Sequence, residues 1–285
     1  MNPLISAKGL SKSYGKFKAL DAIDVEIAPG AIAGLIGPNG AGKTTAMKAM
    51  LGLCDFTGDL QVCGHDPREQ RHLLMQDVCF IADVGILPKW MQARQAIEYL
   101  SGVHPRFDRN KAQQLLAKTS INPHSRIKTL SKGMVTQLHL ALVMAIDVKL
   151  LILDEPTLGL DIMYRKEFYD RLLSDYCDQE KTVLISTHQV EEIEALLTHL
   201  LFIRKGRLIL DSSMDAIPDT FHEVLVAPEA TTHARLYNPL HERKLLGRIA
   251  FIYHNQDPEV LRSLGEVHTP AISDLFVAMM QGAQE

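Results

Sequence analysis

The chain has 285 residues, of which 46% are hydrophobic and 22% charged, and its formal net charge is −4. This composition is typical of a globular protein that folds on its own, as one large domain or two. Basic and acidic residues are interspersed, which argues against tight nucleic-acid binding. The most apolar stretch, residues 138–153, is broken by Asp147 and Lys149. We therefore expect no membrane span, because a span needs about 20 uninterrupted apolar residues.

The start of the chain and its cysteines favour a cytosolic protein. The opening residues MNPLISAKGLSKSYG lack the charged-then-apolar pattern and the cleavage site of a secretory signal. The cysteines form no C-x-x-C pair and the histidines have no metal-binding spacing, so we expect buried free thiols and no structural metal. The four cysteines are Cys54, Cys63, Cys79 and Cys177.

The first thirty residues predict an antiparallel strand layer. Apolar and polar residues alternate in short runs at 4–10 and 19–27. Turn signals lie at Tyr14-Gly15-Lys16 and at Pro29-Gly30, where each run could reverse direction.

Residues 37–44, GPNGAGKT, match the phosphate-binding pattern G-x-x-x-x-G-K-[ST] in full. An apolar run at 31–36 predicts the strand before this loop, and residues 45–53 predict the helix after it. The positive N-terminal end of that helix would face the anion. The sequence therefore predicts a site for a nucleoside triphosphate.

Each residue type in this loop has a chemical reason to be there. Glycines at Gly37, Gly40 and Gly42 allow successive backbone N–H groups to converge on the β-phosphate. Lys43 would add a positive charge at the β- and γ-phosphates, and the Thr44 hydroxyl would be a ligand for Mg²⁺.

A helical insert is predicted from about 85 to 146. Helical periodicity covers 89–100, 109–118 and 132–145, with Gly102, Pro105 and Pro123 between the segments. Ser131 precedes the third helix, where an N-cap is expected.

The next part of the chain predicts a parallel sheet. Two apolar strands, 150–154 and 182–186, flank a helix at about 163–177. Residues 200–203 and 207–210 then predict a hairpin around Lys205-Gly206.

The pattern changes at about 211–219, which we interpret as a domain boundary. A nucleotide-binding domain would span 1–219, and residues 220–285 would form a small α+β appendage. That appendage is predicted to contain strands at 223–227 and 248–253 and an amphipathic helix at 272–280.

The run LLILDEP places two acids at the carboxyl edge of a strand, where ligands bind in open α/β sheets. Asp154 could hold Mg²⁺ through water. Alternation along an extended segment would point Glu155 elsewhere, toward an attacking water, so we predict it to be the general base.

With the phosphate loop followed by these two acids, the chain resembles the ATP-binding subunit of an ABC transporter over about residues 4–215. The similar segments are LSKGM at 130–134, GLD at 159–161, THQ at 187–189, Tyr14 in SKSYG, and TPAISDLFVAMM at 269–280, the last resembling the closing helix of bacterial export ATPases. The resemblance implies a P-loop NTPase core of the α/β class with a parallel sheet, an N-terminal antiparallel layer, a helical insert and a C-terminal appendage.

The resemblance also implies roles for single residues. Tyr14 would stack on adenine, and His188 would contact the γ-phosphate and hold the attacking water. Ser131 and Gly133 would meet the γ-phosphate bound by a partner subunit, so that ATP closes a dimer. The implied ATP-contacting residues are Tyr14, Gly37, Pro38, Asn39, Gly40, Ala41, Gly42, Lys43, Thr44, Thr45, Ser131, Gly133 and Asp161; Thr44, Asp83 and Asp154 would hold Mg²⁺.

The chain departs from the family pattern at four positions. Asp83 stands where relatives carry a glutamine that contacts Mg²⁺ and the membrane partner. Lys132 and Met134 replace a glycine and the glutamine of the signature, and Leu158 replaces a small residue. Lys132 could either contact the γ-phosphate or point to solvent.

The implied function is ATP hydrolysis by a homodimer, or a dimer with a related subunit, that drives a separate membrane permease, with export favoured. Residues 85–100 resemble the segment that receives that permease. Trp90 and Met91 would be partner anchors if exposed, or core residues if buried, and the sequence leaves both open.

Two other functions compete with this one. A soluble ABC-type switch acting on DNA or the ribosome would usually carry coiled-coil insertions, zinc modules or two nucleotide domains, none of which is visible. A small-molecule kinase would leave LSKGM, GLD and His188 unexplained.

Overall fold

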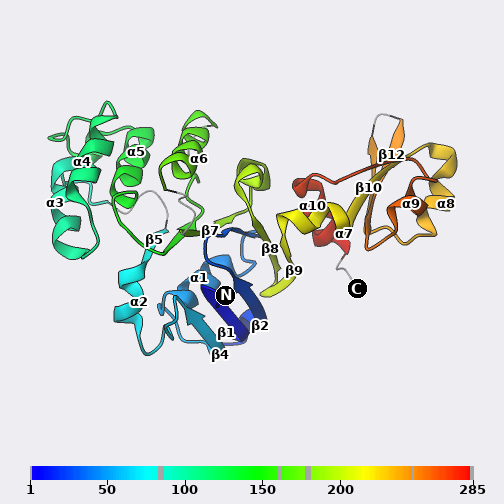
Figure 1. The fold of residues 1–285 in the computed structure, drawn as a ribbon, viewed down its shortest axis with the longest axis horizontal. Coiled ribbons are helices and arrows are strands. Elements are labelled where there is room, and N and C mark those ends of the chain that lie inside the picture. Colours follow the sequence, from blue (N-terminus) through cyan, green and yellow to red (C-terminus); the bar gives the residue numbers. More distant parts are fainter. Residues whose placement is uncertain (1, 83–86, 159–161, 177–180, 246, 283–285) are drawn as a thin grey trace.

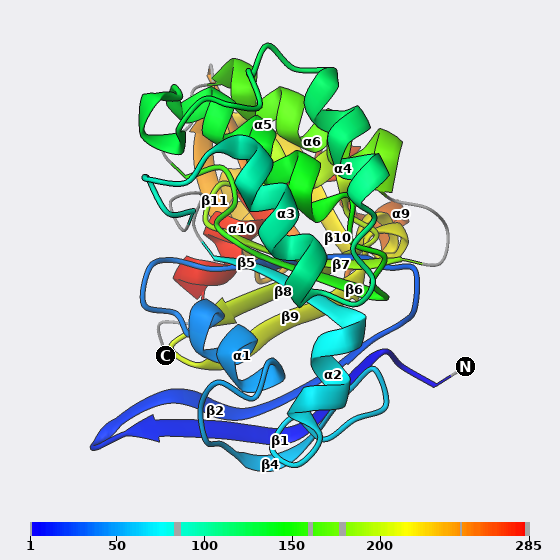
Figure 2. The same cartoon turned by 90° about the vertical axis from the view of Figure 1, so that its left-hand side faces the viewer.

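The computed structural model describes residues 2–82, 87–158, 162–176, 181–245 and 247–282. A helical lobe and a C-terminal sheet lie at opposite ends of the molecule, with a layered body between them (Figure 1). Figure 2 shows the layers of that body from the side of the lobe.

The N-terminal layer is a three-stranded antiparallel sheet in the order β2-β1-β4. Its strands are β1 (Ile5–Tyr14), β2 (Phe17–Ile27) and β4 (Thr57–Val62). The antiparallel layer predicted at 4–10 and 19–27 is confirmed, and both strands run on to a tight turn between Tyr14 and Phe17.

A six-stranded sheet in the order β5-β6-β7-β3-β8-β9 forms the centre, with parallel pairing throughout except for the edge strand β9. Its strands are β3 (Ile32–Ile36), β5 (Val78–Ala82), β6 (Leu150–Asp154), β7 (Thr182–Thr187), β8 (His199–Arg204) and β9 (Arg207–Ser213). Residues of β6 and β7 are buried along their whole length. Continuous apolar runs are expected for parallel strands covered on both faces.

The two faces of the central sheet carry separate apolar clusters. One face packs against the N-terminal sheet, α1 (Lys43–Met50) and α2 (Arg71–Asp77). The opposite face packs against α5 (Lys132–Val143), α6 (Ile162–Tyr176) and α10 (Ile272–Gly282).

The described cysteines are partly buried thiols that pack against these clusters: Cys54 and Cys63 on the first and Cys79 on the second. Burial raises the pKa of Cys63 and of Cys79 to about 12, so both stay protonated and unreactive at neutral pH. Cys177 lies outside the described residues.

The helical lobe contains α3 (Ala93–Val103), α4 (Arg109–Ala117), α5 and a 3-10 turn, Ile127–Thr129, around a core of its own. The first helix begins later than the predicted residue 89, because the backbone N–H of Gln92 donates to the Gln95 side chain (2.9 Å) at the helix start. Met91 is buried in the lobe at 8% exposure, whereas Trp90 is 69% exposed. The two residues left open by the sequence thus have opposite environments.

The C-terminal region forms a second antiparallel sheet in the order β11-β12-β10-β13 around a small core. Its elements are α7 (Ile217–Thr220), β10 (Phe221–Val226), α8 (Thr231–Arg235), β11 (His241–Leu245), β12 (Arg248–His254), α9 (Pro258–Leu261) and β13 (Glu266–His268), with 3-10 turns at Met214–Ala216 and Pro228–Ala230. The final helix α10 does not share that core. Ile272, Leu275 and Ala278 join the cluster on the central sheet instead.

None of the helices in the described part of the chain is long and apolar enough to cross a bilayer.

Candidate functional site

The predicted phosphate loop joins the end of β3 to the start of α1, and close packing explains two of its glycines. A Cβ at Gly37 would lie 2.4 Å from the carbonyl oxygen of Ile203. Gly42 has φ of +116°, and a Cβ there would lie 2.6 Å from the carbonyl oxygen of Ala19. Gly40 adopts φ of +79°, the left-handed region that glycine tolerates best. Any larger residue at 37 or 42 would therefore displace the loop.

Lys43 is the first residue of α1, two residues earlier than the predicted helix start, and its side chain is only 6% exposed. Its Nζ donates to the Gly37 carbonyl at 2.7 Å and lies 3.1 Å from Oε1 of Glu155. The ammonium group is therefore held inside the loop by oxygen atoms, as a phosphate-binding lysine needs to be.

A pocket of about 220 Å³ lies over this loop and is lined by Phe17, Ala19, Glu155 and residues 38–45. Phe17 is 62% exposed at the β1–β2 turn. Phe17 was not named among the residues predicted from the sequence. It could have been, because Phe17 is a second aromatic residue only three positions after the predicted adenine contact Tyr14. Tyr14 pairs with Phe17 across the turn, and its half-exposed ring lies 5.0 Å from Nζ of Lys12.

The two acids that follow β6 differ in their surroundings. Asp154 is buried and accepts a short hydrogen bond from the Ser186 hydroxyl of β7. Glu155 was expected to be extended, and that is wrong: its φ is +47°, the left-handed region. Its backbone N–H donates to the Ser186 carbonyl and hydroxyl, both at 3.1 Å, and these bonds stabilise the turn. The turn, rather than strand alternation, points Glu155 at the loop.

His188 follows β7 and completes a chain of polar contacts. Its Nδ1 lies 2.9 Å from Oε2 of Glu155, whose other oxygen pairs with Lys43. Three residues that are far apart in sequence thus meet beside the phosphate loop. No group of three or more His, Cys, Asp or Glu residues that could hold a metal by themselves occurs within the described ranges.

The signature-like segment lies at the start of α5. The Ser131 hydroxyl accepts from the backbone N–H of Met134 (3.2 Å), as an N-cap does, and Lys132 is exposed. Gly133 is buried because the ring of Tyr164 in α6 lies where a Cβ would project, 2.4 Å away. Neither Ser131 nor Gly133 lines the loop pocket of its own chain.

Two of the predicted features cannot be placed. Asp83, and Gly159 to Asp161 with the predicted ATP contact Asp161, lie outside the described residues. Leu158, the last residue before that gap, is exposed.

Comparison with known proteins agrees with this geometry. A family model described as "ABC transporter" matches residues 20–158. The chain is 31% identical to the Nod factor export ATP-binding protein I of Cupriavidus metallidurans, over 98% of each chain. It is 32% identical to the daunorubicin resistance ATP-binding protein DrrA3 of Streptomyces coeruleorubidus, over 75% of this chain and 69% of the relative.

Among solved structures, an ATP-binding subunit of an ABC transporter covers 75% of this chain and 91% of its own, with a TM-score of 0.66. At 22% identity that likeness shows the fold alone. The sequence relatives carry the assignment further: this chain belongs to the ATP-binding proteins of the ABC transporter family and is an ATPase.

Proposed function

We propose that this chain is the ATPase subunit of an exporter, and that it works as a dimer and drives a separate membrane permease. The contact chain Lys43–Glu155–His188 beside the phosphate loop carries this proposal. It brings together a cation for the phosphates, a carboxylate base and a histidine, which are the groups that phosphoryl transfer to water requires.

Within the proposal, the backbone of residues 37–45 and the N-terminus of α1 hold the phosphates. Lys43 exchanges its bonds to Gly37 and Glu155 for phosphate oxygens when ATP binds. That exchange releases Glu155 to accept the proton of the attacking water, while His188 contacts the γ-phosphate and keeps the water in place. Tyr14 stacks on the base.

The site also suits Mg²⁺, which usually takes one or two protein oxygens together with phosphate oxygens and water. Thr44 offers a hydroxyl at the start of α1, and Asp154 offers a buried carboxylate at the end of β6. Mg²⁺ bound there would neutralise charge on the phosphates. A contribution from Asp83 stays a prediction from the family resemblance.

A dimer is proposed because one chain does not supply the whole site. The loop pocket has no contribution from Ser131 or Gly133, although both belong to the signature-like segment. A second copy placed head to tail would bring its Ser131 hydroxyl and the N-terminus of its α5 to the γ-phosphate. ATP bound between two copies would then favour the closed dimer.

Export is proposed because of what the relatives are named for. One is a Nod factor export protein and the other a daunorubicin resistance protein. We place the chain on the cytoplasmic face of the membrane, where ATP is available. Exposed Trp90 on the helical lobe is the proposed contact with the permease, since large exposed aromatic residues often anchor partners.

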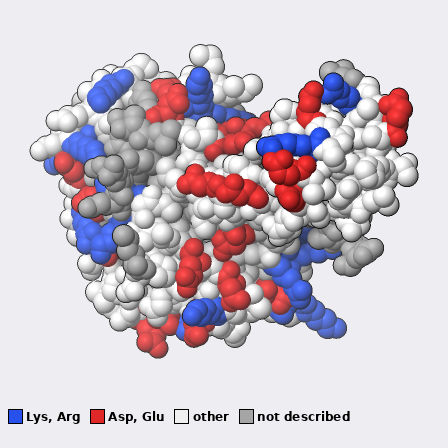
Figure 3. All heavy atoms as spheres, turned by 45° about the vertical axis from the view of Figure 1, so that its right-hand side comes forward, with Lys and Arg blue, Asp and Glu red and all other residues white. Residues whose placement is uncertain are grey.

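A switch acting on nucleic acid is less well supported. On the face drawn in Figure 3, acidic side chains run through the centre, and basic ones gather in separate groups toward the edges. The described basic side chains drawn on this face form no continuous stripe of the kind that follows a phosphate backbone.

Two variants test the ATPase and dimer roles, with Lys48→Ala on the exposed side of α1 as a matched control. Lys43→Ala should lose ATP affinity in calorimetric titration. Glu155→Gln should still bind ATP, release phosphate about 10²- to 10⁴-fold more slowly, and accumulate as a dimer on size exclusion. A monomeric Glu155→Gln with normal turnover would refute both roles.

The permease partner is tested by isolating the tagged chain from detergent extract. A co-purifying integral membrane protein, lost when Trp90 is changed to Ala, supports the proposal. Recovery of ribosomes or DNA without any membrane protein would overturn it.

A further inference from the structure

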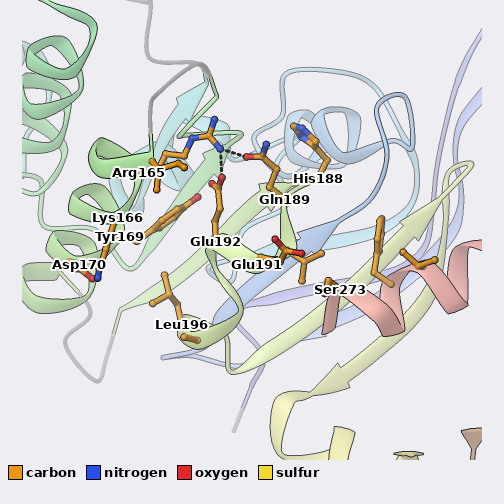
Figure 4. Close-up of a pocket in the computed structure, with 15 residues that line it drawn as sticks. Arg165, Lys166, Tyr169, Asp170, His188, Gln189, Glu191, Glu192, Leu196 and Ser273 are labelled. Carbon is orange, nitrogen blue, oxygen red and sulfur yellow. Dashed lines mark hydrogen bonds and ion pairs between the residues drawn. The ribbon is translucent and has the colours of Figure 1, made fainter. Parts of the chain in front are cut away.

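A second cleft, of about 810 Å³, is lined in part by His188 and shares no lining residue with the loop pocket (Figure 4). Its walls are α6, the segment 188–196 after β7, and α10. This segment contains two 3-10 turns, Val190–Glu192 and Glu194–Leu196. Short 3-10 turns are held by few backbone hydrogen bonds. Side-chain contacts are therefore needed to fix the position of this segment.

Arg165 of α6 supplies such contacts. Its Nη1 donates to Oε1 of Gln189 at 2.6 Å and forms a short ion pair with Glu192. Figure 4 shows the guanidinium reaching across the cleft to both side chains. Gln189 is the immediate neighbour of His188, so Arg165 binds the side chain of the residue that directly follows that histidine.

Glu192 is also tied to the loop that follows the base. The Thr157 hydroxyl lies 3.1 Å from Oε2 of Glu192 and 3.2 Å from the Tyr169 hydroxyl. Thr157 and Tyr169 are both buried, and burial raises the pKa of Tyr169, so its hydroxyl stays protonated. Both ends of the Glu155–His188 contact are thus connected to one polar network.

The ion pair between Arg165 and Glu192 is strong enough to stabilise the position of the segment after β7. The Arg165 and Glu192 side chains are about one-fifth exposed, so their ion pair is less screened by water than a surface pair. Hydrogen bonds to charged groups are shorter and stronger than neutral ones. Removing either partner leaves the other charge poorly solvated and frees the segment to shift.

We propose that Arg165 and Glu192 form a positioning pair that fixes segment 188–192 and so holds the His188 imidazole against Glu155. This inference rests on the proposed roles of Glu155 and His188. Neither Arg165 nor Glu192 lines the loop pocket; each acts through the segment that carries His188.

The test compares ATP hydrolysis and ATP affinity in the full-length chain. Arg165→Ala and Glu192→Gln should lower kcat by about tenfold or more while the ATP dissociation constant stays within about twofold, since small displacements near the reacting groups can cost as much as 10²-fold. Arg165→Lys keeps the charge and should recover part of the rate. Lys166→Ala is the matched control, because Lys166 is the exposed neighbour in α6 and lines the same cleft.

A double-mutant cycle with His188→Ala separates positioning from general stability. If Arg165 acts through His188, adding Arg165→Ala to His188→Ala should cause no further loss of kcat. Losses that multiply, so that the double variant is slower than His188→Ala by the full factor of Arg165→Ala, would overturn the inference. Thermal melts of each variant identify any that fail to fold, in which case Arg165→Lys and Glu192→Gln carry the same cycle.

The proposed function and this inference fail differently. If His188→Ala or Glu155→Gln turns over at the wild-type rate, the proposed catalytic roles are wrong. If both lose activity but Arg165→Ala and Glu192→Gln do not, only the positioning pair is wrong.

Discussion

At the scale of single residues, two exposed aromatic side chains at the β1–β2 turn differ in their position relative to the phosphate site. Phe17 lines the loop pocket, whereas Tyr14 stands across the turn from it, beside Lys12. An exposed aromatic ring next to a phosphate loop offers a surface on which a nucleobase can stack. The family resemblance assigns that contact to Tyr14, and the pocket adds Phe17 to it.

We therefore predict that Phe17→Ala weakens ATP binding by about tenfold, because stacking of a base on an aromatic ring contributes about 1–3 kcal/mol. Affinity for inorganic tripolyphosphate, which has no base, should not change. Calorimetric titration with both ligands, for wild type, Phe17→Ala and Tyr14→Ala, distinguishes the two rings. Equal losses for both ligands would mean that Phe17 supports the loop and does not contact the base.

A second residue-scale prediction concerns His222 in β10. Its side chain is 5% exposed, and burial lowers its pKa below the ordinary value, although Asp219 acts in the opposite direction. The unfolded chain then binds a proton more readily than the folded one, so this histidine makes the free energy of unfolding fall as pH drops below about 6.5. His222→Leu should reduce that pH dependence.

Urea unfolding at pH 7.5 and pH 5.5 measures the effect. The difference between the two pH values should be smaller for His222→Leu than for wild type. The exposed residue His124 provides the control, and His124→Gln should behave as wild type does. An unchanged difference in His222→Leu would show that the pKa of this histidine does not differ between the folded and the unfolded chain.

At the scale of elements, the sequence predicted most accurately those strands whose residues are all buried and apolar. The strand 150–154 was predicted with its bounds because every residue of β6 is buried and apolar up to Asp154. The strands β4 and β13 were not predicted, because β4 buries only Leu60 and Val62 and β13 has three residues. Likewise no local pattern could reveal Ser186 beneath Glu155 or Arg165 beside Gln189, since those contacts join separate elements.

The contact between α5 and α6 gives a prediction at the same scale. Gly133→Ala would place a methyl group into the Tyr164 ring, 2.4 Å from its nearest atom, so the ring must leave its position. We expect a lower melting temperature and slower ATP hydrolysis for Gly133→Ala. In the double variant Gly133→Ala, Tyr164→Ala, the space is free and the melting temperature should recover relative to Gly133→Ala alone.

Recovery of the melting temperature in the double variant separates two roles of Gly133, its packing against Tyr164 and its contact with a γ-phosphate. If the double variant is stable but still hydrolyses ATP slowly, a glycine at 133 is needed for the γ-phosphate of the second copy as well as for α6. A double variant that melts as low as Gly133→Ala would contradict the steric explanation.

At the scale of the whole molecule, the C-terminal sheet and the ATPase body are joined through α10. This helix buries Ile272, Leu275 and Ala278 against the central sheet, and Phe276 packs edge-to-face on Phe202 of β8. The backbone N–H of Ile272 lies 3.4 Å from Oε1 of Glu194, and α10 also forms a wall of the cleft beside segment 188–196. The domain division near 211–219 stays a proposal, and if it is correct, α10 returns from the second unit to the first.

Arg243 is the side chain that ties the C-terminal sheet to this helix. From β11 its guanidinium contacts Glu223 of β10 at 3.0 Å and Asp274 of α10 at 2.7 Å, and both acids are largely buried. Arg243→Ala should lower the free energy of unfolding by about 2 kcal/mol, because it leaves two carboxylates without their charged partner. It should also speed hydrogen exchange in α10, while ATP affinity stays unchanged because the loop pocket is formed elsewhere.

Arg248→Ala removes a comparable pair with Glu266 that is exposed, so it should cost less than about 1 kcal/mol. Equal effects of the two substitutions, measured by urea unfolding, would show that Arg243 does not hold the two parts together.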